Sequence, residues 1–229
     1  MATISDNLQQ LHQRLTTACT AADRPVQSVT LLTVSKTFPG DAVRAAFAAG
    51  ERRFGENYVQ EGLDKIAQLA DLRSQLEWHL IGPLQSNKTR AVAEAFDWVH
   101  SVDRLKIAER LSAQRPQGLP PLSVCLQVNI SGEASKSGCA VAELPALARA
   151  VAALPRLRLR GLMAIPEPTG DFEAQRAPHR ALARLLAELN TTQDLALDTL
   201  SMGMSADLEA AIAEGATMVR VGTAIFGQR

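Results

Sequence analysis

The stretch Val29-Thr30-Leu31-Leu32-Thr33-Val34-Ser35-Lys36, followed directly by Thr37-Phe38-Pro39, decides how this chain is interpreted. Its β-branched and apolar residues predict a short buried strand, which ends before the proline. That strand delivers one amine, Lys36, to the loop behind it, and in a barrel of alternating strands and helices this end carries the chemistry. A lysine held there and partly desolvated can form a Schiff base with a carbonyl compound. A solvated lysine just past a strand end is the alternative.

The same pattern, an apolar strand followed by a helical segment, repeats along the chain. The periodicity predicts eight strands, over 30–35, 53–55, 77–82, 98–102, 123–130, 158–165, 199–202 and 218–221. It predicts helices over 5–22, 41–49, 59–72, 88–95, 104–113, 143–153, 172–189 and 206–213. Because continuous apolar strands that alternate with helices indicate a covered parallel sheet, we predict an α/β fold.

The count of eight units favours one arrangement of such a sheet. We predict a single domain over residues 1–229, a (β/α)8 TIM barrel with an extra N-terminal helix. An open doubly wound sheet is the alternative, but no GxGxxG motif follows the first strand. No Gly/Ser-rich linker, low-complexity segment or internal repeat divides the chain.

The composition restricts the classes of function. Apolar residues make up 46% of the chain, and 24 basic residues balance 24 acidic ones. A net charge of zero argues against a broad nucleic-acid or anionic-membrane surface. No apolar run reaches the roughly 18 residues of a membrane span, and no leader-like segment opens the chain. Three scattered cysteines, Cys19, Cys125 and Cys139, lack metal-ligand spacing and suit a reducing compartment, so we expect a cytoplasmic protein without a metal site.

The segments after the last two predicted strands have the residues of an anion site. In such barrels, the loops after strands seven and eight commonly bind phosphate. Ser205 stands at the predicted N-cap of the last predicted helix, and Gly222-Thr223 offers unhindered backbone N–H groups and a hydroxyl. Simple capping and tight packing explain each feature equally well. Their occurrence on both of the expected loops favours the phosphate interpretation.

Arg220 lies inside the last apolar strand, where an unpaired charge is costly. It either pairs with a carboxylate of a neighbouring strand or points at a ligand. An arginine that faces a pyridine nitrogen tunes a pyridoxal ring, because its permanent charge lets it only donate and keeps that nitrogen unprotonated. A ligand with a carbonyl group, a phosphate and a ring nitrogen would satisfy Lys36, the phosphate loops and Arg220 together. Pyridoxal 5′-phosphate (PLP) is that ligand.

Eight stretches, in order across nearly the whole chain, carry a resemblance to a known family. They are Leu32–Lys36, Phe54–Tyr58, Trp78–Lys88, Gln127–Ser131, Ser135–Gly138, Gly161–Met163, Leu200–Asp207 and Val219–Gly227. The chain resembles the pyridoxal phosphate homeostasis proteins, also called PLP-binding proteins and formerly described as proline-synthetase-associated. Those proteins resemble the barrel domain of alanine racemase, the fold type III group.

The resemblance implies a set of cofactor-binding residues with separate roles. Lys36 would carry the Schiff base and Arg220 would meet the ring nitrogen. The phosphate would be held by Ser205, Gly222 and Thr223, with Ser201 as a second hydroxyl in reach. The ring or its substituents would be lined by Asn57, His79 and Met163. From the residues alone, His79 is better explained as a hydrogen-bonded core histidine than as a general base.

The resemblance also implies a PLP carrier or buffer that maintains intracellular vitamin B6 homeostasis without robust catalysis. Racemases of this type need an opposing tyrosine from an additional β domain, whereas this sequence ends just past the eighth strand and has only Tyr58. We therefore expect a non-enzyme with no catalytic residue; an amino-acid racemase and a class I aldolase-like lyase are the alternatives. PLP-dependent apoenzymes are candidate partners, neither nucleic acid nor membrane is expected, and we expect a monomer. The role of Lys136 stays open.

Overall fold

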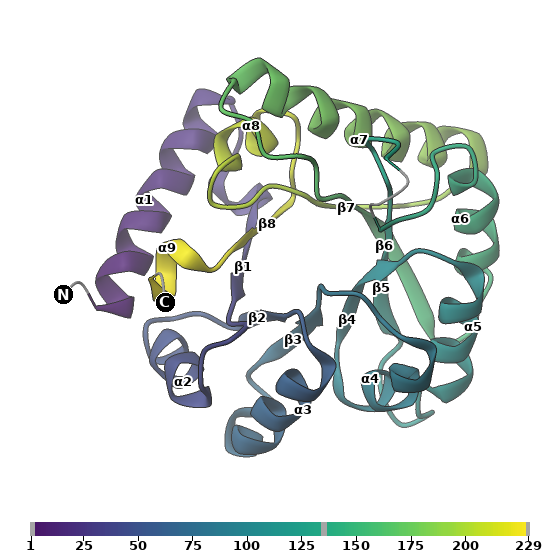
Figure 1. The fold of residues 1–229 in the computed structure, drawn as a ribbon, viewed down its shortest axis with the longest axis horizontal. Helices are drawn as coiled ribbons and strands as arrows, with labels where there is room; N and C mark the ends of the chain where they lie inside the picture. The colour runs from purple at the N-terminus through teal and green to yellow at the C-terminus, as the bar shows by residue number, and fades with distance from the viewer. Residues whose placement is uncertain (1–2, 134–136, 228–229) are drawn as a thin grey trace.

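Eight parallel strands close into a barrel in the computed structural model, which describes residues 3–133 and 137–227. Each strand pairs with the next along the chain, and the last pairs with the first through Thr30–Met218 and Leu32–Arg220 (Figure 1). The strands are β1 (Thr30–Val34), β2 (Arg53–Glu56), β3 (Glu77–Leu80), β4 (Trp98–Val102), β5 (Leu122–Gln127), β6 (Leu157–Met163), β7 (Thr199–Ser201) and β8 (Met218–Val221). The TIM barrel prediction is confirmed, and the doubly wound alternative is wrong.

Helices surround the barrel on the outside (Figure 1). They are α1 (Ile4–Ala21), α2 (Gly40–Ala48), α3 (Val59–Gln68), α4 (Thr89–Ala95), α5 (Leu105–Gln114), α6 (Leu144–Ala152), α7 (Phe172–Gln193), α8 (Leu208–Ala213) and α9 (Thr223–Phe226). The predicted extra N-terminal helix is α1, which begins at a Thr3–Asp6 capping box and lies against α8 and α9. The short helix α9, directly after β8, was not predicted.

Several predicted strands are too long at their C-terminal ends. The strand predicted over 77–82 ends at Leu80, and the one predicted over 158–165 ends at Met163. The apolar residues just beyond, Ile81 and Ala164, are buried all the same. Burial at the barrel mouth therefore explains their apolar character.

The prediction that Ser205 is the N-cap of the last predicted helix is also wrong. Helix α8 begins at Leu208, and Asp207 occupies the N-cap position that we had given to Ser205. The carboxylate of Asp207 accepts a hydrogen bond from the N–H of Met204, which folds residues 204–207 into a turn. Ser205 is thereby left inside the turn.

Two kinds of core follow from the alternation of side chains along each strand. The large apolar core lies between the strands and the surrounding helices and includes Phe54, Trp78 and Leu162. Two smaller apolar clusters share the other face of the strands, which turns into the barrel. They consist of Leu32, Val34, Ile81 and Met218, and of Trp98, Cys125 and Met163. The remaining buried positions on this inner face are polar, and they lead to the candidate site.

Candidate functional site

A pocket of about 720 Å³ opens at the C-terminal end of the strands. Its walls come from the segments after β1, β2, β3, β6, β7 and β8. The lining residues are Val34, Lys36, Thr37, Phe38, Asn57, Ile81, Ile165, Met204, Ser205, Ala206, Arg220, Gly222, Thr223 and Gly227. This is the end of a TIM barrel at which ligands bind.

The structure brings six of the nine predicted site residues together around this pocket. They are Lys36, Asn57, Ser205, Arg220, Gly222 and Thr223. The other three, His79, Met163 and Ser201, do not line it; each is fully buried inside the barrel. Lys136 lies outside the described residues.

The loop that carries Lys36 is fixed on both sides of the lysine. The carbonyl of Ser35 accepts a 2.6 Å hydrogen bond from Lys65 Nζ, and the N–H of Thr37 donates to Glu61. Thr37 has φ of 66°, a left-handed conformation that is strained for a β-branched residue. Lys36 itself is exposed and makes no hydrogen bond or ion pair within the described part of the chain. The backbone is therefore held while the amine stays available.

The anchor of this loop is a buried ion cluster that the sequence analysis missed. Lys65 Nζ lies 2.7 Å from Glu56 and 2.8 Å from Glu61, and the hydroxyl of Ser35 donates to Glu56. Burial raises the pKa of Glu56, although its hydrogen bond and ion pair with Lys65 oppose the rise. In the sequence, only the i,i+4 spacing of Glu61 and Lys65 pointed to this cluster.

Arg220 reaches the floor of the pocket from inside the barrel. One guanidinium nitrogen donates to the carbonyl and hydroxyl oxygens of Ser201, at 2.6 and 2.8 Å, and the other donates to Ala164 O at 3.0 Å. A guanidinium has five N–H donors, so these bonds leave two. Burial lowers the pKa of Arg220 to about 10, and the group therefore remains a cation at neutral pH. Its buried, partly engaged donors can meet an acceptor in the pocket.

Three neutral polar side chains also face the pocket without partners. Among the described residues, the side chains of Asn57, Ser205 and Thr223 form no hydrogen bond. The turn that presents Ser205 is held by Asp207, which also accepts from His179 at 3.0 Å. Burial would raise the pKa of Asp207, but the hydrogen bonds from His179 and from the N–H of Met204 hold it below its ordinary value.

Two glycines allow the backbone to approach closely at this rim. A Cβ at Gly222 would lie 2.8 Å from Val34 O, and one at Gly82 would lie 2.0 Å from the carbonyl of Asn57. Neither position accepts a side chain without moving the backbone. The glycine at 222 brings Thr223 beside β1, where Lys36 follows.

The chemistry of this donor set fits one kind of ligand. An unpaired amine takes an aldehyde, unpaired hydroxyls and the N–H groups that begin a helix take an anion, and buried N–H donors take a neutral ring acceptor. PLP carries all three groups on one ring. The residues present therefore fit PLP.

His79 and Ser201 belong to a polar chain beneath the pocket. His79 Nδ1 lies 2.9 Å from His100 Nε2, and His100 Nδ1 lies 2.8 Å from the hydroxyl of Ser201. His79 Nε2 lies 2.9 Å from Glu77. The interpretation of His79 as a hydrogen-bonded core residue is confirmed. His100, which the sequence analysis did not single out, is the middle member of this set of hydrogen bonds.

Comparisons with known proteins agree with this fold and site. The family model of the alanine racemase N-terminal domain matches residues 6–229. This match places the chain in the class of alanine racemase-type barrels. The chain is 66% identical to the pyridoxal phosphate homeostasis protein of Pseudomonas aeruginosa, over 100% of this chain and 97% of that protein. The Escherichia coli protein of the same name is 57% identical, over 100% of this chain and 98% of that protein.

A solved structure gives the same result. PipY of Synechococcus elongatus, described with PLP bound, has a TM-score of 0.85 and 40% identity, and the match covers 98% of this chain and 100% of that one. The chain belongs to the pyridoxal phosphate homeostasis protein family.

Other kinds of site have less support in the described residues. The three cysteines are free and buried, and no group of three or more His, Cys, Asp or Glu in residues 3–133 and 137–227 could hold a metal ion. Among the described helices, none combines the length and the hydropathy needed to cross a bilayer.

Proposed function

We propose that this protein binds PLP reversibly through an imine at Lys36 and acts in the cytoplasm as a carrier or buffer of the cofactor, not as an enzyme. One observation carries the proposal: an amine and hydroxyls without partners among residues 3–133 and 137–227, and a partly engaged buried guanidinium, converge on one pocket. Arg220 is buried, and a buried donor left unused is costly unless a ligand pairs with it. The homeostasis proteins that this chain resembles bear the name of the same cofactor.

Each residue of the pocket has a separate role in this proposal. Lys36 captures the aldehyde with loss of water, and the fixed loop around it aims the amine. Ser205 and Thr223, with the backbone at Gly222, bind the phosphate. Arg220 donates to the ring nitrogen and Asn57 lies along the ring.

The lack of a second acid–base group supports a carrier. Racemisation at a carbon atom needs one group that removes a proton and another that returns it on the opposite face. Among the described lining residues, the Lys36 amine and the Arg220 guanidinium are the ionisable side chains. None of these lining residues carries a carboxylate, imidazole, thiol or phenol. The single tyrosine, Tyr58, is 61% exposed and does not line the pocket. A ring nitrogen kept unprotonated by Arg220 is also a weak electron sink.

The test is chemical capture at a defined residue. Purified protein is incubated with PLP, reduced with borohydride, digested and analysed by mass spectrometry. The expected result is a phosphopyridoxyl group on Lys36, with a visible absorption band before reduction. Modification of other lysines at the same PLP concentration, with Lys36 unmodified, would reject the assignment.

A second measurement separates the carrier from the enzymes. The loaded protein is mixed with a PLP-dependent apoenzyme and, in a parallel sample, with L-alanine. A carrier restores the apoenzyme activity and leaves alanine unracemised. D-Alanine produced at ordinary enzyme rates would support the racemase, and a protein that takes a sugar carbonyl but no PLP would support the aldolase-like lyase.

A further inference from the structure

A chain of hydrogen bonds runs through the barrel interior from the N-terminal end to the floor of the pocket. It joins Glu77, His79, His100, Ser201 and Arg220, with heavy-atom distances of 2.9, 2.9, 2.8 and 2.8 Å in that order. The three middle members are completely buried. The His79 ring stacks on Trp98, with centroids 5.2 Å apart, and meets His100 edge-on. The side chains are therefore fixed, and the donor of each hydrogen bond depends on which ring nitrogen of each histidine carries a proton.

The charged end at Arg220 sets the direction of the chain. A guanidinium only donates, so the hydroxyl of Ser201 accepts from it, and its one proton goes to His100 Nδ1. His100 then carries its proton on Nε2 and donates to His79 Nδ1. By the same rule, His79 carries its proton on Nε2 and donates to the carboxylate of Glu77. Every bond points from the cation to the anion.

The opposite direction does not fit the same atoms. It would need a protonated Glu77 and another acceptor for the hydroxyl of Ser201, and none is present among the described residues. Glu77 is poorly suited to hold a proton: burial would raise its pKa, but the hydrogen bond from His79 keeps it below the ordinary value. Burial also lowers the pKa of both histidines, which keeps them neutral, as the chain requires.

We propose that Ser201, His100 and His79 are positioning residues, which act through one directed hydrogen-bond chain to fix Arg220 and so set how its free donors meet the ligand in the pocket. The part of this proposal that concerns the ring nitrogen rests on the proposed PLP function. The proton arrangement does not, because it belongs to the protein alone. Aligned hydrogen bonds between opposite charges strengthen one another in a low dielectric, so a break at His100 is felt at Arg220.

The first experiment tests the proton arrangement without any ligand. The protein is labelled with ¹⁵N at histidine, and long-range ¹H–¹⁵N correlation spectra are recorded at pH 7, with signals assigned from single-histidine variants. Both His79 and His100 should be neutral with the proton on Nε2. A proton on Nδ1 of either ring, or an imidazolium at that pH, would contradict the proposed direction of the hydrogen-bond chain.

The second experiment tests the effect on Arg220 with two variants of similar size. In His100→Asn, the side-chain carbonyl can replace Nδ1 as the acceptor for Ser201, whereas His100→Leu removes the acceptor. PLP labelled with ¹⁵N in the ring is bound to each protein, and the ring-nitrogen shift and the dissociation constant are measured. H100L should change the shift and weaken binding by about fivefold, while H100N stays within about twofold of the unmodified protein.

The outcomes separate this inference from the proposed function. If the two variants weaken binding equally and neither changes the nitrogen shift, His100 is only a packing residue and the inference is wrong. If the unmodified protein shows no adduct on Lys36, the proposed function fails instead. The tautomers measured without ligand then still decide whether the directed chain exists.

Discussion

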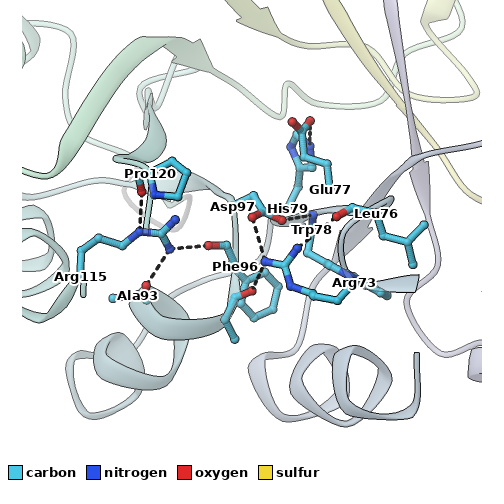
Figure 2. A network of polar contacts seen from close by, with 11 residues as sticks. Arg73, Leu76, Glu77, Trp78, His79, Ala93, Phe96, Asp97, Arg115 and Pro120 are labelled. Atoms are coloured by element: carbon cyan, nitrogen blue, oxygen red, sulfur yellow. Dashed lines mark hydrogen bonds and ion pairs between the residues drawn. The ribbon is translucent and has the colours of Figure 1, made fainter. Parts of the chain in front are cut away.

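The two ends of this barrel treat their charged residues in opposite ways. At the C-terminal end, Lys36 makes no hydrogen bond or ion pair among the described residues, and the guanidinium of Arg220 lines the pocket. At the N-terminal end, two arginines are held by protein acceptors. Arg73 donates to Asp97 and to two carbonyls, and Arg115 donates to three carbonyls (Figure 2). Polar groups that have hydrogen-bond partners within the protein contribute to stability, and those without such partners can bind a ligand.

This comparison agrees with the division of labour in TIM barrels, where one face binds ligands and the other supports the fold. In the N-terminal network, Asp97 accepts from Arg73 and also from the backbone N–H of Trp78, so the protein itself supplies donors to both carboxylate oxygens (Figure 2). Arg160 and Asp198 form a similar paired contact further round this end. Substitutions at the two ends should therefore change different properties, and the predictions below test that separation from the largest effect to the smallest.

The largest effect is expected from Lys36→Ala. Loss of the amine removes the imine, so the affinity for PLP should fall by about 1,000-fold, or about 4 kcal/mol. The free energy of unfolding should stay within about 0.5 kcal/mol, because Lys36 is exposed and without a partner among the described residues. Absorption titration and urea unfolding measure the two quantities.

Lys88→Ala is the matched control for this variant. Lys88 is an exposed lysine of the same rim that does not line the pocket. A yellow K36A protein with unchanged affinity, or a K88A protein without colour, would contradict the assignment of the amine.

The opposite pattern is expected at the N-terminal end. Arg115 is 4% exposed and its guanidinium binds the carbonyls of Ala93, Phe96 and Pro120. Arg115→Met should keep much of the packing but leave these carbonyls unpaired, at a cost of about 3 kcal/mol. Chemical denaturation should show this loss while PLP affinity changes by no more than about twofold. A variant with normal stability and weak PLP binding would break the comparison.

The pH dependence of stability tests the chain that connects the two ends. Burial, assisted by the positive charge of Arg220, holds the pKa of His100 well below 6.5, so the folded protein keeps this ring neutral. The unfolded chain takes up the proton as the pH falls through about 6.5, so stability is lost towards acid. Between pH 7.5 and 5, a histidine that stays neutral contributes about 2 kcal/mol to this loss.

The control for this effect is His100→Leu, which should make the loss smaller over the same pH range. Glu56 acts in the opposite direction, because its raised pKa makes the folded state gain stability as the pH falls. The comparison of H100L with the unmodified protein, by denaturant unfolding at each pH, isolates the histidine. Parallel pH profiles in the two proteins would show that His100 is not neutralised by folding.

The smallest effects are expected at the two hydroxyls that we propose bind the phosphate. Ser205→Ala and Thr223→Val each remove one hydrogen bond to an anion and should weaken PLP binding by about three- to tenfold. The affinity for pyridoxal, which has no phosphate, should stay the same, as should the melting temperature. An equal loss for both ligands would place the phosphate elsewhere in the pocket.

Local sequence patterns were sufficient for the architecture and for the rim of the pocket. Each apolar strand, with the polar residues that follow it, predicted one strand–helix unit of the barrel. Because parallel strands run in the same direction, the segments that follow them, with Lys36, Ser205 and Gly222, were placed at one end. The errors in this part are small and local. Helix α8 begins three residues after Ser205, with Asp207 at the N-cap position, because the carboxylate of Asp207 holds residues 204–207 in a turn, and spacing alone does not reveal that turn.

The sequence by itself thus determined the barrel, and it predicted five residues of the pocket that suit PLP, to which the family resemblance added Asn57. Only the tertiary structure decided which groups stand behind that rim: Lys65 under the Lys36 loop, and His100 between His79 and Ser201. His100 lies 21 residues from His79 and 101 residues from Ser201 in the sequence, and closure of the barrel brings them within hydrogen-bond distance. The physical reason is that strand and helix periodicity records which face a residue takes, whereas a buried polar partner is chosen by the geometry of the closed sheet.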